Sequence, residues 1–435
     1  MKTIIAYFKN QKLVHEYMDE IESYSDNLRS KIKLTHRFIK TRRSHLKDVK
    51  KTLKLKTIEN IKLIDHISLL DPNYIELYSL KDRKNKINSP NILNKEKKGS
   101  LEYSVPDISI DLLKNIYAVG YSILIHNNKI GLSSSLYNEE VKHDPKKPLL
   151  QQITSYKNKT FNLNIKNIID DKEDKIYIHL LSEHANNYYH WLYEILPKLI
   201  KTNEIIKASK EYEDKEFILL INKGLFPQIL QTIDLCVDFK YKLKEIELYD
   251  SIFCKNIIYC SDFWLSLDNT RFKPSVVDEF FVDRYAVTLV KEQFKPFQSD
   301  KKPSKKVYLD RKKGPRSLIN DSKIKQIIKK YDFEIVDTSS LSFIEQIKLF
   351  SETSILIGPA GAAFSNILFM QEDTQAIIFS PNALATNFYV FQQMADVANI
   401  NLLHILGKNP LESIHDNLEI CPVDLENQIK KILDN

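Results

Sequence analysis

Apolar and polar positions alternate most regularly in the C-terminal third of the chain. Short apolar runs predict strands there, at 305–310, 333–337, 354–358 and 376–380. Between them, apolar residues spaced three and four apart predict helices, at 320–331, 341–352 and 362–370. Asn320 or Asp321 and Ser342 are the expected caps of the first two helices. This β-α-β-α-β-α-β order predicts one Rossmann-like half, followed by a last helix at 425–433.

The middle of the chain shows the same alternation of apolar and polar positions, but less regularly. A hairpin is predicted around residues 126–128. Apolar runs predict further strands with helical stretches between them, at 175–181, 216–221 and 256–260. The charged segment 290–303 contains two prolines and is the expected domain boundary. The fold class that follows is α/β.

The first hundred residues differ from the rest. Residues 11–70 have helical spacing, acidic in the first half and basic in the second, which is compatible with an antiparallel helical hairpin. Residues 82–100 are polar with Pro and Gly and are expected to form a linker. We therefore expect 1–100 to be a basic helical extension, ahead of domains at 101–295 and 296–435. A chain of 435 residues suits two domains.

Charge is concentrated in that extension. The net charge is +7, and residues 29–56 are rich in Lys and Arg with a single acid, Asp48. Such a segment suits an anionic partner, namely lipid headgroups, a charged glycan or nucleic acid, or else it is a solvated helical face. No RNP, KH, zinc-finger or helix-turn-helix signature favours nucleic acid. No nucleic-acid partner is therefore expected.

Cysteine usage and hydropathy indicate the compartment. The four cysteines form no CxxC pair and match no zinc spacing, which favours a reduced, cytoplasmic setting. No uncharged apolar run of roughly 18 residues occurs, so no membrane span is expected, and the N-terminus is a poor signal peptide. The acidic stretch 170–174 is expected to be a solvated loop, so no metal site is predicted.

One stretch of the middle region carries unexpected polar residues. In "NNYYHWLYEILPKL", Asn187, His190 and Glu194 are spaced three and four apart, which places them on one face of an otherwise apolar helix. The alternatives are a buried polar network and a functional site in which His190 or Glu194 acts as a base. The aromatic residues around them, Trp191 included, offer flat surfaces that stack against sugar rings. Pro197 is expected to kink or loosen the helix.

Two segments of the C-terminal third are suited to phosphate. The turn 357–366 leads from a strand into a helix through Gly361, which allows close backbone approach, and Ser365 and Asn366 add hydrogen-bonding groups. The loop 308–321 contains Arg311 and Arg316 and also follows a strand. Both lie at expected strand C-termini, so they are predicted to face one crevice. The alternatives are a tight packing turn and a solvated loop; neither a G-x-G-x-x-G nor a Walker A motif is present.

Taken in order, these segments resemble glycosyltransferase family 61. The resemblance rests on "NNYYHWLYEILPKL", "VYLDRKKGPRSLIND", "LSFIEQIKLF" and "ILIGPAGAAFSNILFM", which span residues from about 184 to 381. The family's His-Trp pair and following acid fall on His190, Trp191 and Glu194. Its Arg-rich segment and Gly-Ala-x-x-x-Asn turn fall on the residues Arg311, Arg316, Asn320, Gly361, Ala362 and Asn366. Many relatives have His where this chain has Ala360.

The resemblance implies a GT-B fold, with two Rossmann-like domains facing a cleft, and inverting, metal-independent sugar transfer without a cofactor. It implies catalysis by Glu194 and His190 and an acceptor side that includes Asn187 and Trp191. The expected nucleotide-sugar contacts are Arg311, Arg316, Asn320, Gly361, Ala362, Ser365 and Asn366. The acceptor is expected to be a growing surface glycan, such as a capsule, or a lipid-linked glycan, with an anionic membrane surface held through 29–56. The enzyme would be cytoplasmic or peripheral on the inner face of the plasma membrane. A non-catalytic nucleotide- or glycan-binding relative is the alternative, because His is absent at Ala360.

Overall fold

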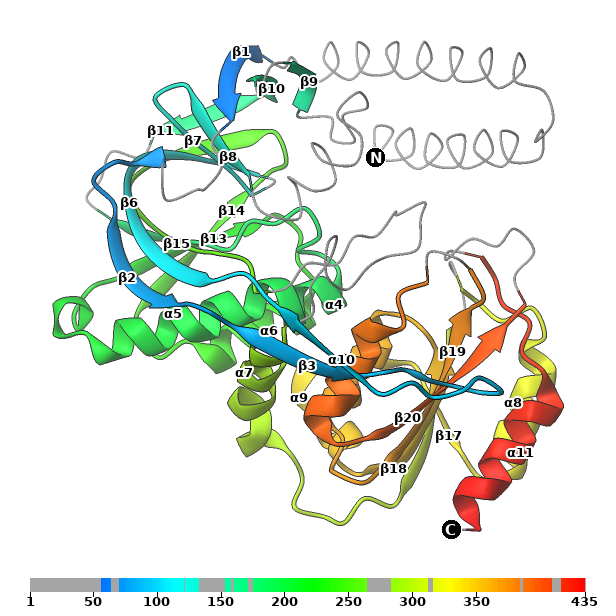
Figure 1. Cartoon of the computed structure of the whole chain (residues 1–435). Coiled ribbons are helices and arrows are strands. Elements are labelled where there is room, and N and C mark those ends of the chain that lie inside the picture. The colour runs from blue at the N-terminus through cyan, green and yellow to red at the C-terminus, as the bar shows by residue number, and fades with distance from the viewer. Residues whose placement is uncertain are drawn as a thin grey trace, which may run out of the picture.

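The described residues form two large β-sheets and a third, two-stranded sheet, with helices packed between and around the large sheets (Figure 1). The computed structural model describes residues 56–63, 70–120, 122–132, 153–157, 160–170, 175–263, 283–311, 316–383, 386–408 and 416–434. The basic segment 29–56 lies outside these residues apart from its last position. Most of the expected helical region 11–70 does too.

The second sheet is parallel and forms the Rossmann-like half that the sequence predicts. Its strand order is β17-β16-β18-β19-β20-β4, with bounds Glu334–Val336, Lys305–Leu309, Thr353–Pro359, Gln375–Pro381, Asn401–Gly407 and Asn91–Ile92. Its helices are α8 (Asp321–Lys330), α9 (Phe343–Ser351), α10 (Tyr389–Ala398) and α11 (Pro422–Leu433), with the 3-10 helix η7 (Ala362–Phe369). The four predicted strands and the Ser342 cap are confirmed, and Ser342 forms a capping box with Glu345. The sequence analysis did not predict α10 and β20.

The first sheet combines a parallel part with a mainly antiparallel part, in which one strand pair is parallel. The parallel part has the order β14-β13-β12-β15, with bounds Tyr241–Ile246, Phe217–Asn222, Ile176–His179 and Asp250–Cys260. Beyond β15 follow β6, β7, β8, β1, β10 and β9, with bounds Ile108–Val119, Ile123–His126, Lys129–Leu132, Lys56–Leu63, Thr160–Ile165 and Ile153–Lys157. The predicted hairpin is β7–β8, with Asn127 and Asn128 at positive φ in its turn.

Two predictions for the N-terminal part are wrong in the described residues. Residues 56–63 form strand β1 rather than helix. The expected linker contains β3 (Lys84–Asn88) and β4, and β5 (Ser100–Ser104) follows directly. In β3 the alternation is real, with Asn85 and Ile87 buried between exposed neighbours, but only Ile87 of the five is apolar. A polar strand of this kind gives almost no hydrophobic signal.

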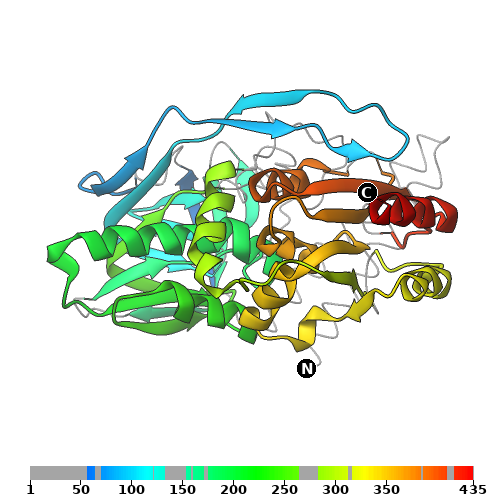
Figure 2. The same ribbon diagram turned by 90° about the horizontal axis from the view of Figure 1, so that it is seen from below.

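The segment from β2 (Ile75–Leu80) to β5 crosses both halves as a strap. Figure 2 shows this blue and cyan run along one side of the molecule, over the first sheet and past α10 and β20. Arg83 forms a buried ion pair with Asp283 at 2.6 Å, and the backbone N–H of Asn88 donates to Asp396 of α10. Strand β4 pairs with β20, so the N-terminal part supplies an edge of the second sheet.

The two halves share one hydrophobic core. A single buried cluster includes residues of both sheets, and the helices between them meet through aromatic side chains. Phe343 of α9 packs edge-on against Phe294 of α7 (Arg284–Phe294) at 4.8 Å and against Phe369 at 5.7 Å. Complete burial of one such side chain stabilises the fold by about 1.5–3 kcal/mol.

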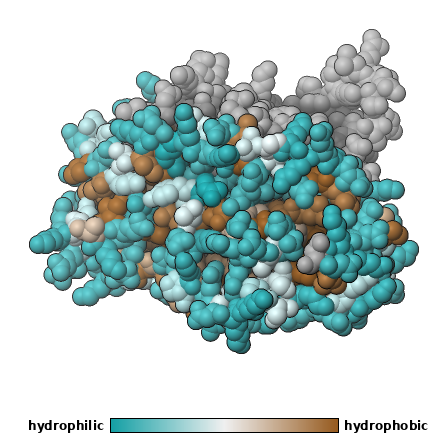
Figure 3. All heavy atoms as spheres, turned by 60° about the horizontal axis from the view of Figure 1, so that its bottom comes forward, coloured by the Kyte–Doolittle hydropathy of each residue, from teal (hydrophilic) through white to brown (hydrophobic). Residues whose placement is uncertain are grey.

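The surface in Figure 3 is mostly hydrophilic, with apolar residues in separate patches. Among the described helices, none is long and apolar enough to cross a membrane.

Two buried histidines make stability depend on pH. Burial lowers the pKa of His179 on β12 and of His404 on β20 to about 3. The unfolded chain protonates histidine near pH 6.5. Each neutral histidine therefore contributes fully to the free energy of unfolding above about pH 6.5. This contribution is lost as the pH falls toward 3, by at most ~1.4 kcal/mol per pH unit for each histidine.

We expect His404→Gln to weaken this pH dependence. Between pH 7 and 5.5, the variant's free energy of unfolding should fall by about 1 kcal/mol less than that of the unmodified protein. Urea unfolding at the two pH values measures the difference. An equal fall in both proteins would show that His404 does not stay neutral in the fold.

Candidate active site

In the second sheet, the predicted basic loop and glycine turn come together. The strand order reverses between β16 and β18, and such a switch point is where open α/β sheets bind ligands. Arg311 follows β16, and Gly361 follows β18. The Arg311 Nη1 donates to the carbonyl of Ala360 at 3.3 Å, so the two segments are in contact across the switch point.

Gly361 is required by this contact rather than by its backbone angles. Its φ of 174° is extended and open to any residue. A Cβ at this position would lie 2.1 Å from Arg311 Nη1. The missing side chain therefore leaves the space that the guanidinium occupies.

The site is electropositive. Burial, and secondly the charge of Arg316, lower the pKa of Arg311 to about 10. Burial and the neighbouring Arg316 both disfavour the charged form of Arg311. An anion bound beside the guanidinium would stabilise that charged form. Asp310 precedes Arg311 directly, but its buried carboxylate pairs with Lys325 at 2.8 Å. Lys325 also holds Asp321 at 2.8 Å.

Three of the other expected nucleotide contacts have structural partners. The Asn320 side chain exchanges hydrogen bonds with the backbone of Ile420, at 2.7 and 3.2 Å, and does not cap α8. Asn366 is fully buried; its Oδ1 accepts from the Tyr188 hydroxyl at 2.8 Å, and its amide donates to Gln346. Ser365 is also fully buried, and its carbonyl accepts from the Tyr193 hydroxyl at 2.9 Å.

Asn320 joins α8 to the C-terminal segment, whereas Ser365 and Asn366 join the two halves. Ala362, which begins η7, is only partly buried and lies next to Gly361.

The other constellation lies at the carboxyl edge of the first sheet. After β12, the helix runs through α4 (Tyr188–His190), the π-helical turn η3 (Trp191–Ile195) and α5 (Leu196–Ala208). In the wide turn, the Leu196 N–H reaches the carbonyl of Trp191, five residues back. Pro197, with no N–H to donate, follows directly. Single π turns inside helices are frequent at functional sites.

His190 and Glu194 are neighbours across this turn. The Nδ1 of His190 lies 2.9 Å from Oε1 of Glu194, and the two side chains are 1% and 8% exposed. The His184 ring lies against the His190 ring, with centroids 4.6 Å apart and planes tilted by 34°. Glu183 Oε2 is 3.9 Å from His184 Nε2. Two imidazoles and two carboxylates thus gather just after β12, where the order of the parallel strands reverses between β12 and β15.

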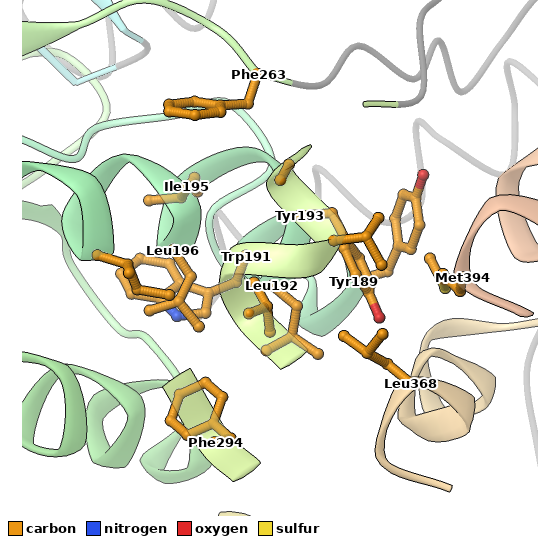
Figure 4. Packing of buried hydrophobic residues seen from close by; sticks show 14 of the residues in the cluster. Tyr189, Trp191, Leu192, Tyr193, Ile195, Leu196, Phe263, Phe294, Leu368 and Met394 are labelled. Atoms are coloured by element: carbon orange, nitrogen blue, oxygen red, sulfur yellow. The ribbon is translucent and has the colours of Figure 1, made fainter. Parts of the chain in front are cut away.

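Asn187 and Trp191 lie in different environments. Asn187 is exposed and caps the helix, accepting from the Tyr189 N–H at 3.0 Å. Trp191 is fully buried, and its Nε1 donates to Thr232 at 2.7 Å, so its faces are not available to a sugar. Figure 4 shows the apolar surroundings: Trp191 and Leu196 in the core, and Tyr189 and Tyr193 near Leu368 and Met394. A tryptophan in an apolar helix can pack in the core or stack on a sugar ring, and the spacing of residues in the sequence does not distinguish these two roles.

Sequence analysis also missed a buried ion pair beside the site. Lys198 Nζ lies 2.5 Å from Asp262 Oδ1, and both side chains are nearly buried. Lys198 is four residues after Glu194, so the polar stripe continues for another turn. This four-residue spacing was the sequence signal that could have identified Lys198. In the described residues, no group of three or more His, Cys, Asp or Glu side chains is arranged to hold a metal ion.

The fold is α/β, with a buried His–Glu pair beside one switch point and two neighbouring arginines beside the other. Residues 188–377 match the family model Glycosyltransferase 61. The protein therefore carries a glycosyltransferase family 61 domain and is a glycosyltransferase. The matched segment includes His190, Glu194, Arg311 and Gly361. No curated protein matches the chain.

We expect Gly361→Ala to weaken anion binding without unfolding the protein. The new methyl group displaces the guanidinium of Arg311, since a side-chain end moves more easily than backbone. Affinity for inorganic pyrophosphate, measured by calorimetry, should fall about tenfold, equivalent to ~1.4 kcal/mol. Gly99→Ala is the matched control, because no atom lies within 4 Å of its added Cβ. Unchanged affinity would mean that Arg311 does not hold the anion.

Proposed function

We propose that the enzyme transfers a sugar, with inversion and without a metal, from a nucleotide-sugar donor to a growing surface glycan such as a capsule. The observation that carries this proposal is the joining of the two switch-point sites. Tyr188, two residues before His190, donates to Asn366, five residues after Gly361. A GT-B arrangement, with donor and acceptor sides meeting between the halves, accounts for that link.

The C-terminal half is the proposed donor side. Arg311, Arg316 and the first amides of η7, beginning at Ala362, bind the phosphates. Negative charge grows on the leaving nucleotide in the transition state, and fixed cations and amides lower its energy. Arg311 is already partly desolvated by burial in the protein. Its guanidinium therefore needs little further desolvation when it binds the phosphates of the donor.

His190 is the proposed base, and Glu194 holds it. The Glu194 carboxylate lies at Nδ1 of the imidazole, and the proposal assigns to Nε2 the role of accepting the proton of the acceptor hydroxyl. The oxygen freed of its proton then attacks the anomeric carbon from the side opposite the nucleotide, and the configuration inverts. The reverse assignment, with Glu194 as base, uses the same two side chains.

Residues 29–56 are the proposed contact with anionic lipid, which would hold a cytoplasmic enzyme on the inner face of the membrane near a lipid-linked acceptor. Binding to phosphatidylserine vesicles by the full chain and by a chain lacking residues 1–55 tests this. The truncation stops at 55 because β1 begins at Lys56. Equal binding by both chains would contradict the proposal.

Removing either member of the acid–base pair should abolish transfer. We expect Glu194→Gln and His190→Ala to reduce turnover of a UDP-sugar panel by about two to four orders of magnitude while UDP binding survives. Released nucleotide measures turnover, and calorimetry measures binding. Glu204→Gln is the matched control, since Glu204 lies on α5 and pairs with Lys201 at the surface. Full activity in both site variants would make the pair structural.

Arg311→Ala should act on UDP binding, which the variants of the acid–base pair retain. UDP affinity should fall by about tenfold or more, because a partly buried cation is lost from the phosphate site. Unchanged affinity would remove Arg311 from the donor site. If the unmodified enzyme binds UDP-sugars but turns none over with any glycan acceptor, the non-catalytic alternative holds.

A further inference from the structure

The polar stripe of the active-site helix extends to Lys198. His190, Glu194 and Lys198 are spaced four residues apart along one helical run. Lys198 is nine-tenths buried, and its ammonium is held by Asp262, two residues beyond the end of β15. The result is a chain of charged groups that runs from the carboxyl edge of the first sheet to the acid–base pair.

The ammonium of Lys198 is a permanent charge in this setting. Burial alone would lower the pKa of Lys198, but the carboxylate of Asp262 and, more weakly, the Cys260 and Glu194 side chains raise it above its ordinary value. His179 at the end of β12 stays neutral, because burial and the charge of Lys198 lower its pKa to about 3. Among the described residues, other polar groups near the chain include the phenols of Tyr259 and Tyr189, the imidazole of His184 and the carboxylates of Glu183 and Asp111.

We propose that Lys198 is a positioning residue that keeps Glu194 ionised and directed at His190, with Asp262 fixing the place of the ammonium. The proposal rests on the proposed function of the His190–Glu194 pair.

The charge balance supports this role. A carboxylate buried without a cation tends to take up a proton, and a protonated Glu194 would no longer stabilise a charged imidazole. The Lys198 ammonium, held by Asp262 at 2.5 Å, is the cation on this helical face, four residues after Glu194.

The test compares Lys198→Met with Lys198→Arg, using nucleotide release from a UDP-sugar panel as the assay. In Lys198→Met we expect turnover to fall about 10- to 100-fold, with donor KM and UDP affinity within about twofold of the unmodified enzyme. The acidic limb of its pH–rate profile should move to higher pH, because Glu194 then loses its charge sooner. Lys198→Arg should restore both. Lys207→Met is the matched control, since Lys207 lies on the same helix and pairs with Asp238 at the surface.

A double variant separates positioning from stability. Lys198→Met leaves the Asp262 carboxylate buried without its cation, and this can lower Tm by itself. Lys198→Met/Asp262→Asn removes that carboxylate as well. The proposal expects Tm to recover while turnover stays low and the pH profile stays displaced. Recovery of turnover and profile together with Tm would overturn it, as would an undisplaced profile in Lys198→Met.

Variants of the His190–Glu194 pair test the proposed function separately from the inference about Lys198. Full activity in His190→Ala and Glu194→Gln removes the proposed function together with this inference. Inactive pair variants combined with a Lys198→Met enzyme of normal profile remove only the inference.

Discussion

The docking of the active-site helix against η7 is the contact on which the rest of the site depends. Two tyrosines of that helix donate across it, Tyr188 to the Asn366 side chain and Tyr193 to the Ser365 carbonyl. Burial strongly raises the pKa of both phenols, so they remain neutral donors. A buried acceptor that loses its donor costs about 1–3 kcal/mol, which makes any displacement of the helix against η7 unfavourable. The helix that carries His190 and the turn that holds Arg311 are therefore fixed to one another.

Both sites use charge in an apolar setting, but in opposite ways. At the second sheet, Arg311 and Arg316 lie close together, while the nearby Asp310 is neutralised by Lys325. At the first sheet, the Lys198 ammonium lies within hydrogen-bonding distance of an opposite charge, the Asp262 carboxylate. In the proposed function, the two arginines bind the anionic phosphates of the donor, whereas the ion pair beside the helix is already formed without any ligand.

Periodicity was sufficient for the parallel strands β16, β18 and β19 and insufficient for β20 and for the strap. The apolar runs 307–309, 355–357 and 376–379 form the buried centres of β16, β18 and β19, because both faces of each strand are covered there. Strand β3 is buried through Asn85 as much as through Ile87, so a pattern based on hydrophobicity passes over it. For the site, spacing correctly placed His190 beside Glu194, and strand order correctly brought Arg311 to Gly361. Spacing could not tell that Trp191 and Asn366 face protein, since their partners Thr232 and Tyr188 are fixed only by tertiary packing.

The strap has a consequence for the history of the chain. Two-domain transferases built from separable halves can exchange one half for another and so acquire a new donor or acceptor. Here β4 completes the edge of the second sheet, and Arg83 forms its buried ion pair with Asp283, just ahead of α7. A C-terminal half transplanted by itself would arrive with β20 as an open edge, prone to pairing with other chains. Changes of specificity in this architecture are therefore expected to arise by substitution within loops rather than by recombination of whole domains.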